Sequence, residues 1–379
     1  MKDVFIASDN ILSPIGLTAA GNFVQLTASV SGVKLQEDDS LSACPFYASL
    51  FNGDEFLLNE SPDQTYTKFE KLLIASISDA LQKDSSINAA DKKTVLIISS
   101  TKGNISLLET EAYSRELESR IALNTSAKLV AEYFHFANKP IVISNACISG
   151  LVAIITGMRL IQSGQYDNAV VTGADVISKF ILSGFQSFQA ISSSKCKPFD
   201  AARNGINLGE GAGTIILSSN KKYADGIRIA GGSISNDANH ISGPSRTGEE
   251  LNFAITKALK DANVAATDIG FISAHGTATI FNDEMEAKAI TLANLQHVPV
   301  NSLKGYFGHT LGAAGIIESI ISAYSLQQNM VLPTLGFETP GVSKPINVCT
   351  SLYSSALKNC LKTASGFGGC NAAIVISKQ

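Results

Sequence analysis

Short apolar runs rich in β-branched residues alternate with longer amphipathic stretches along this chain, and the alternation occurs twice. The first series has strand-like runs at residues 4–7, 95–100, 141–144, 169–172 and 214–217, and helix-like stretches at 66–81, 126–136, 148–163 and 178–190. The second has strand-like runs at 226–233, 271–274, 298–301 and 372–376, and helix-like stretches at 249–262, 283–293 and 311–326. The pattern predicts an α/β fold of two similar layouts, with helices covering the sheets.

The strand-like runs are apolar throughout and do not alternate with polar residues. This is typical of strands buried on both faces and favours parallel strands. The polar segment 218–225 separates the two layouts. We therefore predict one half at residues 1–218 and a second half at residues 226–379.

Charge and hydropathy exclude several classes of protein. The net charge is −4, and no run of Lys or Arg offers a surface for nucleic acid. The longest apolar stretches, at 151–161 and 316–326, fall short of the roughly 20 residues of a membrane span. Only 16% of the residues are charged, against roughly 25% in an average soluble protein. We therefore expect a partner subunit to cover part of the surface.

Cysteine and histidine spacing bears on compartment and metals. The six cysteines lie at 44, 147, 196, 349, 360 and 370 without CxxC spacing, which is typical of reduced thiols and predicts a cytoplasmic protein. The five histidines lie at 135, 240, 275, 297 and 309 without HExxH or Cys/His spacing. We expect no metal site.

One cysteine lies where a strand-like run turns into a helix. Residues 141–150 read IVISNACISG, so Cys147 has small neighbours and directly precedes the helix. The start of a helix has unpaired N–H groups and about half a positive charge, which lowers the pKa of a thiol and favours the nucleophilic thiolate. Cysteine is also common as a small buried apolar residue. In this context the two interpretations carry equal weight.

Two histidines follow strand-like runs. His275 is followed by Gly276, and His309 lies in the glycine-rich segment 301–315 that leads into a helix. Ligands of open α/β sheets bind at the carboxyl ends of the strands, so both histidines are candidate site residues. We expect structural roles for the other three histidines.

Two further places stand out by context. Glu318 interrupts an apolar helix, and a carboxylate is seldom buried unless it is paired. Lys304 is the partner that we expect, and a solvated Glu318 is the alternative. Phe367 lies among three glycines, which let a ligand or nucleophile approach the backbone closely. A plain tight turn explains that segment equally well.

In this order, these segments resemble the β-ketoacyl-[acyl carrier protein] synthases of the thiolase-like superfamily. The resemblance covers nearly the whole chain and rests on LSPIG at 12–16, AC at 146–147, KPFD at 197–200, GEGAG at 209–213, AHGT at 274–277, GH at 308–309 and GFGG at 366–369. It implies a thiolase-like duplicated fold of five αβαβα layers. It also implies an acyltransferase that works as a dimer.

The resemblance further implies the chemistry. Cys147 matches the nucleophile that accepts the acyl chain, and His275 and His309 match the two histidines of the elongating synthases. The reaction would be a decarboxylative Claisen condensation of the acyl-enzyme with malonyl-acyl carrier protein. The two imidazoles would stabilise the enolate, and the backbone N–H groups of Cys147 and Phe367 would form the oxyanion hole.

Other matched residues would support the reaction. Lys304 and Glu318 match a structural charged pair, Thr277 and Thr279 match threonines that contact pantetheine, and Phe367 matches a gating phenylalanine. The resemblance implies no cofactor beyond the 4′-phosphopantetheine of the acyl carrier protein. The expected partners are that carrier protein, with its malonyl and acyl thioesters, and a second ketosynthase-like chain.

Three alternatives stay open at this point. The pathway is fatty-acid elongation or a specialised polyene or polyketide-like pathway. The chain is a homodimer subunit, or the catalytic subunit of a heterodimer with a chain-length factor. A thiolase-like acyltransferase is a third interpretation, in which Cys370 would be the second catalytic cysteine.

Overall fold

The computed structural model describes residues 2–53, 66–238, 240 and 242–379. Its strands are β1 (Phe5–Leu12), β2 (Lys34–Gln36), β3 (Phe46–Ser49), β4 (Thr94–Ser99), β5 (Ile141–Ile143), β6 (Asn168–Asp175), β7 (Leu208–Gly209), β8 (Gly211–Ser218), β9 (Ile227–Asn236), β10 (Ile269–Ser273), β11 (Val300–Asn301), β12 (Met330–Val331), β13 (Tyr353–Ser354), β14 (Asn359–Gly366) and β15 (Cys370–Lys378). Its helices are α1 (Ala19–Thr27), α2 (Lys68–Gln82), α3 (Leu107–Thr110), α4 (Arg115–Ile121), α5 (Leu123–Tyr133), α6 (Ser149–Gln162), α7 (Lys179–Ser187), α8 (Glu249–Ala262), α9 (Ile280–Leu292), α10 (Lys304–Phe307) and α11 (Ala314–Gln328).

The main sheet repeats one strand arrangement. Its order is β11-β10-β14-β15-β9-β1-β8-β6-β4-β5, and β9 and β1 meet through the single pair Phe5 and Arg228. The sheet thus consists of two sets of five strands, β11-β10-β14-β15-β9 and β5-β4-β6-β8-β1, each written from the edge inward. If the strands of each set are numbered in chain order, both sets have the order 3-2-4-5-1. In both sets the two outer pairs of strands are parallel and the two inner pairs are antiparallel. The fold is therefore a duplication.

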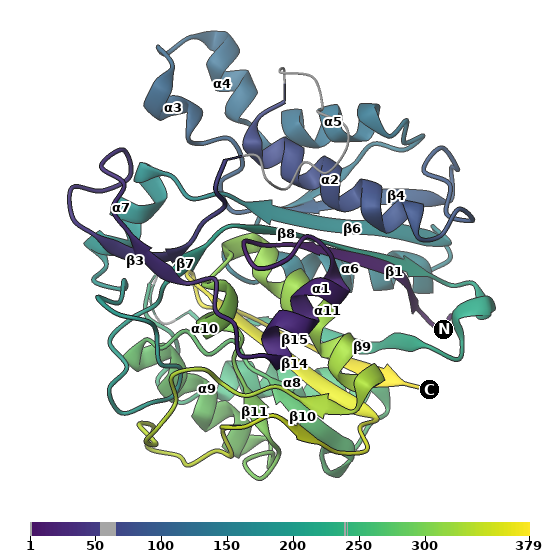
Figure 1. The fold of residues 1–379 in the computed structure, drawn as a ribbon. Coiled ribbons are helices and arrows are strands. Elements are labelled where there is room, and N and C mark those ends of the chain that lie inside the picture. Colours follow the sequence, from purple (N-terminus) through teal and green to yellow (C-terminus); the bar gives the residue numbers. More distant parts are fainter. Residues whose placement is uncertain (1, 54–65, 239, 241) are drawn as a thin grey trace.

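The two sets of strands and their helices form five layers (Figure 1). The helices α2 and α5 cover the outer face of one set, and α8 and α9 cover the outer face of the other. The helices α6 and α11 lie between the sets and contact strands of both. The largest apolar core surrounds this central pair, and a smaller core lies under each outer layer. This is the thiolase-like αβαβα arrangement.

The central helices approach each other through glycine. A Cβ atom on Gly150 in α6 would lie 2.8 Å from the backbone nitrogen of Ile316, and one on Gly315 in α11 would lie 2.6 Å from that of Leu151. Both distances are shorter than real Cβ contacts. The two helix starts, which follow Cys147 and His309 in sequence, therefore lie in direct backbone contact.

The structure corrects part of the sequence prediction. The main sheet is mixed and not purely parallel, because continuous apolar runs report burial on both faces and the helical layers cover every central strand whatever its direction. The pattern also missed α1, the small sheet β2-β3-β7 and the buried strand β14. The predicted helix at 311–326 begins as a 3-10 turn (Leu311–Ala313) before α11. The division at 218 and 226 stays a prediction.

In the described ranges, no helix combines the length and the apolar character that crossing a bilayer requires.

Candidate active site

Cys147 lies in a strained turn between β5 and α6. Ala146, directly before it, has a φ of 45°, which is the left-handed region that residues other than glycine seldom adopt. Such a conformation costs on the order of 1–3 kcal/mol and persists where the surrounding structure imposes it. The side chain of Ser149 accepts a hydrogen bond from the backbone of Asn145 (2.8 Å) and donates one to Ala146 (2.6 Å), which fixes the turn.

Burial dominates the state of the Cys147 thiol. The side chain is 8% exposed, and burial raises the pKa of the thiol to about 12, although the nearby Lys304 ammonium opposes this. The expected lowering by the helix start is therefore outweighed. The resting thiol is neutral, so a base must take its proton when it attacks.

His275 follows β10, and α9 holds its backbone. The backbone N–H groups of His275 and Gly276 each donate to one oxygen of the Glu286 carboxylate, both at 2.8 Å. Thr363 donates its hydroxyl to the same carboxylate (2.6 Å). Because Glu286 is fully buried and belongs to the rigid helix α9, these bonds fix the loop that presents the imidazole.

His309 follows α10 and pairs with the opposite half of the fold. Its backbone N–H donates to Asn207 (2.7 Å), and its carbonyl accepts from Gly209 (3.0 Å). These bonds form an isolated parallel bridge with Leu208. A segment far away in the sequence therefore sets the position of this histidine.

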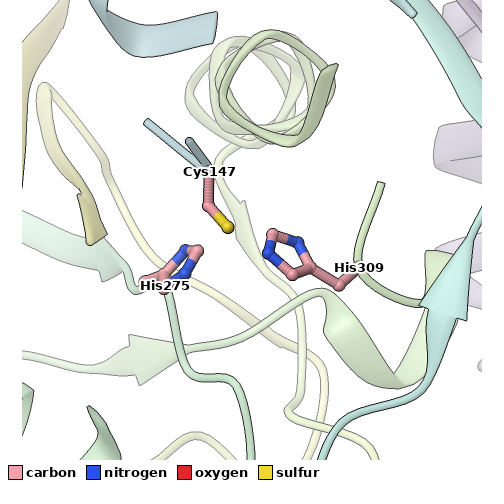
Figure 2. A group of neighbouring side chains, drawn as sticks. All are labelled: Cys147, His275 and His309. Atoms are coloured by element: carbon pink, nitrogen blue, oxygen red, sulfur yellow. The ribbon is translucent and has the colours of Figure 1, made fainter. Parts of the chain in front are cut away.

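The structure brings Cys147, His275 and His309 together (Figure 2). The sulfur atom and one nitrogen of each ring lie within 4.8 Å of one another. The two rings meet edge to face, with centroids 5.2 Å apart. Nδ1 of His275 and both ring nitrogens of His309 are buried without a hydrogen-bond partner in the described part of the chain. Buried polar atoms are rarely left unpaired, so these nitrogens are available to a ligand.

Both imidazoles are held neutral. Burial is the largest cause and lowers the pKa of each ring well below 6.5, and the positive charges of Lys304 and Lys362 lower it further. A neutral imidazole has one N–H donor and one free acceptor nitrogen. Such a pair can accept the Cys147 proton and can also donate to a developing oxyanion.

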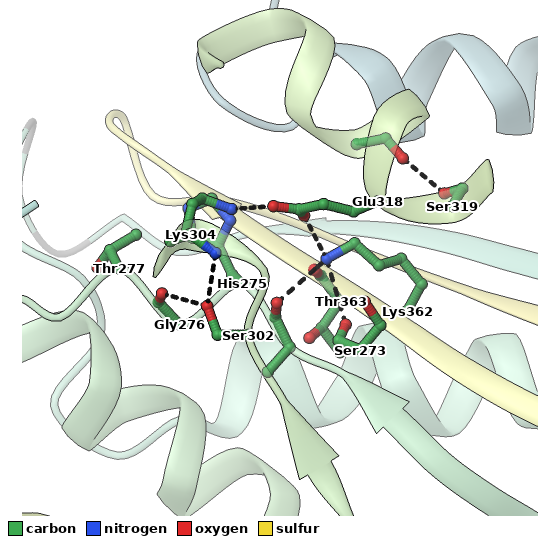
Figure 3. Close-up of polar contacts among 12 residues, drawn as sticks. Ser273, His275, Gly276, Thr277, Ser302, Lys304, Glu318, Ser319, Lys362 and Thr363 are labelled. Atoms are coloured by element: carbon green, nitrogen blue, oxygen red, sulfur yellow. Dashed lines mark hydrogen bonds and ion pairs between the residues drawn. The ribbon is translucent and has the colours of Figure 1, made fainter. Parts of the chain in front are cut away.

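Glu318 lies between two lysines and contacts both (Figure 3). It forms ion pairs with Lys304 and with Lys362, the latter at 2.7 Å, and all three side chains are buried. Burial raises the pKa of Glu318, but the two lysines more than offset it, so the net shift is downward. The predicted pairing of Lys304 with Glu318 is present, and the solvated alternative is not.

A pocket of about 540 Å³ leads to the three side chains. Thr277 and Thr279 line it, and their hydroxyl groups lie 2.8 Å apart. Phe367 lies at its mouth, 38% exposed, with its ring centroid 5.7 Å from that of Phe185 and 5.3 Å from that of Phe188. Thr277, Thr279 and Phe367 therefore line the same pocket as Cys147 and the two histidines.

The turn that carries Phe367 passes over the Cys147 backbone. A Cβ atom on Gly366 would lie 3.0 Å from the Cys147 nitrogen and 3.0 Å from the sulfur of Cys370. Glycine is needed there because a side chain would press on the nucleophile's amide. Cys370 donates its thiol to the carbonyl of Phe367 at 3.4 Å.

The three central residues have donor types that also bind zinc. Lys304 and Lys362 place positive charge beside both rings, however, and that charge opposes a divalent cation. The prediction that the chain holds no metal stays a prediction.

Three residues at the site, Lys362, Glu286 and Asp283, were not predicted from the sequence. Lys362 interrupts the apolar strand β14, the same signal that singled out Glu318 in its helix. Glu286 and Asp283 lie one helical turn apart at the start of α9, and both are fully buried. Nothing local shows that these carboxylates bind the His275 loop, because their partners lie on other elements.

The duplicated fold and its central cysteine define a thiolase-like enzyme. Comparison of the sequence with protein-family models identifies the family within this class. Residues 33–222 match the model of the family described as "Beta-ketoacyl synthase, N-terminal domain", and residues 227–338 match "Beta-ketoacyl synthase, C-terminal domain". The chain belongs to the β-ketoacyl synthase family.

Individual proteins agree with this assignment. The 3-oxoacyl-[acyl-carrier-protein] synthase 2 of Vibrio cholerae serotype O1 is 30% identical, and the alignment covers 100% of this chain and 99% of that protein. Among solved structures, a ketosynthase in complex with its chain length factor from Xenorhabdus doucetiae has a TM-score of 0.87 and 25% identity, and the match covers 100% of this chain and 98% of that one. The ishigamide ketosynthase/chain length factor has a TM-score of 0.91 at 24% identity, with 100% and 99% coverage, and shows the fold alone.

Proposed function

We propose that this chain is a 3-oxoacyl-[acyl-carrier-protein] synthase. It would condense an acyl group held as a thioester on Cys147 with malonyl-acyl carrier protein, with loss of carbon dioxide. One observation carries the proposal: unpartnered ring nitrogens of two neutral histidines lie beside a buried cysteine at the end of a pocket. The family assignment supplies the reaction class.

In the first half-reaction, the Cys147 sulfur attacks the acyl thioester of the carrier while a neutral imidazole takes the thiol proton. The backbone N–H groups of Cys147 and Phe367 would donate to the tetrahedral oxyanion, and the close approach at Gly366 supports this arrangement. The carrier leaves as a thiol and takes up one proton. Exchanging one thioester for another is close to energetically neutral.

In the second half-reaction, the malonyl group loses carbon dioxide and its electron pair forms an enolate. N–H groups of His275 and His309 would donate to the enolate oxygen. The carbanion then attacks the acyl carbonyl, the new carbon–carbon bond forms, and Cys147 leaves and regains a proton. Thr277 and Thr279 line the approach and are the proposed contacts of the 4′-phosphopantetheine arm.

The similarity to a ketosynthase in complex with its chain length factor supports a second arrangement, in which this chain is the catalytic subunit of a heterodimer. The strand β5 is an edge of the main sheet, and its three apolar residues are only partly buried. Edge strands tend to pair with another chain, so we propose β5 as part of a homodimer or heterodimer interface. All six cysteines are free, which supports a reducing compartment, and we propose the cytoplasm.

Intact-mass measurement after incubation with acyl carrier proteins of different chain lengths tests the first half-reaction. The wild type and Cys370→Ala should gain an acyl group, and Cys147→Ala should gain none. An adduct on Cys147→Ala that peptide mapping places on Cys370 would favour the thiolase-like alternative.

Carbon dioxide release from labelled malonyl-acyl carrier protein tests the second half-reaction. His275→Ala and His309→Ala should still accumulate acyl-enzyme but release carbon dioxide about 10²–10³-fold more slowly, the usual effect of removing one oxyanion donor. A variant that decarboxylates at the wild-type rate would remove its histidine from the mechanism.

A further inference from the structure

Lys362 is a buried cation that the proposed reaction does not yet use. It lies in the middle of β14 and is fully buried. Its ammonium group donates to the carbonyl oxygens of Ser273 and Ala274, both at 3.2 Å, and of Thr363 at 2.8 Å. The first two carbonyls lie directly before His275 in the chain.

The same ammonium adds a second positive charge beside the imidazoles. Lys304 and Lys362 share the single carboxylate of Glu318, so these three side chains have a net charge of +1 (Figure 3). Without Lys362, the pair of Lys304 and Glu318 would have no net charge. Ionised groups are costly to bury, so the second lysine needs a reason beyond packing.

The charged and titratable groups around the two rings come from several elements. These groups are Cys147 before α6, Asp283 and Glu286 on α9, Lys304 on α10, Glu318 on α11 and Lys362 on β14. Both carboxylates of α9 already accept backbone N–H groups of the His275 loop. Lys362 binds the carbonyl groups of Ser273 and Ala274, directly before His275. The loop is thus held through its donors by one helix and through its acceptors by one strand.

We infer that Lys362 is a second positioning cation of the condensation site, which holds the His275 loop by its carbonyl groups and adds a positive charge next to both imidazoles. The inference rests on the proposed function, because it assigns Lys362 a part in keeping His275 and His309 ready to donate to an oxyanion. The direction of the pKa shift of both rings agrees with it, since Lys362 acts in the same sense as burial and Lys304.

The test is the pH dependence of carbon dioxide release from malonyl-acyl carrier protein in the wild type and in Lys362→Met. Without the ammonium, the pKa of the histidines should rise, so the acid midpoint should move to higher pH by roughly one unit. The rate should also fall at every pH, because the loop loses its carbonyl contacts. Lys362→Gln serves as a second variant, since it keeps a donor but not the charge and should show the same shift with a smaller loss of rate.

The double variant Lys362→Met/Glu318→Gln separates charge from geometry. It restores a net charge of +1 through Lys304, so the acid midpoint should return toward the wild-type value although the contacts stay broken. A midpoint that does not move in Lys362→Met or in Lys362→Gln would overturn the inference and leave Lys362 a packing residue. A wild type that releases no carbon dioxide would refute the proposed function itself.

Discussion

The close contact between α6 and α11 predicts that adding one methyl group at Gly150 lowers both stability and activity. In Gly150→Ala, the added Cβ would lie 2.8 Å from the backbone nitrogen of Ile316 and 2.9 Å from the carbonyl oxygen of Gly312, whereas ordinary contacts begin at 3.4 Å. Both atoms belong to backbone, so no side chain can rotate away. The starts of α6 and α11 must therefore separate by about 0.6 Å.

This separation acts directly on the site. Cys147 precedes α6 and His309 precedes α11, so their spacing depends on the same contact. Overpacking of this kind costs roughly 1–3 kcal/mol of stability. A misplacement of about 1 Å costs about 10²-fold in rate, so we expect condensation to slow by about tenfold or more. Urea unfolding and the rate of product formation measure the two effects.

Gly184→Ala is the matched control. Gly184 also lies within a helix, α7, but nothing lies within 4 Å of a Cβ built on it. Alanine is favoured over glycine in a helix by up to about 1 kcal/mol, so this variant should be as stable as the wild type or slightly more stable, with an unchanged rate. Wild-type stability and rate in Gly150→Ala would refute the reasoning.

Two further predictions concern access and pH. Phe188→Ala should speed the alkylation of Cys147 by a bulky maleimide severalfold, because Phe188 packs against Phe367 in the pocket lining. Phe180→Ala is the control and should leave the rate unchanged, because the Phe180 ring is equally exposed but lies outside the pocket lining. Equal alkylation rates in both variants would rule out a barrier at Phe188. Acylation of Cys147 should keep its full rate as the pH falls to 6.5, because the pKa of both histidines is lowered well below that value, and mass spectrometry across a pH series should find no midpoint at or above 6.5.

Much of the site could be predicted because its signals are local. A strand, a small-residue turn and the start of a helix around Cys147 occupy residues 141–150, and the structure has them in that order. His275 follows the strand β10 as predicted, whereas the short helix α10 lies between the strand β11 and His309. The interruption of an apolar helix by Glu318 also predicted a buried partner correctly. Each of these patterns depends on residues that are close together in the sequence.

The tertiary structure decided what depends on distant parts of the chain. Lys362 and Ser273 are 89 positions apart, and Thr363 and Glu286 are 77 apart, yet each pair forms a buried hydrogen bond at the site. The direction of the inner strands and the neutral state of Cys147 also depend on residues that are distant in the sequence. Apolar periodicity records only that a residue is buried, whereas strand direction, ion pairs and pKa depend on which groups burial brings together. Which groups come together is determined when the two sets of strands pack around α6 and α11.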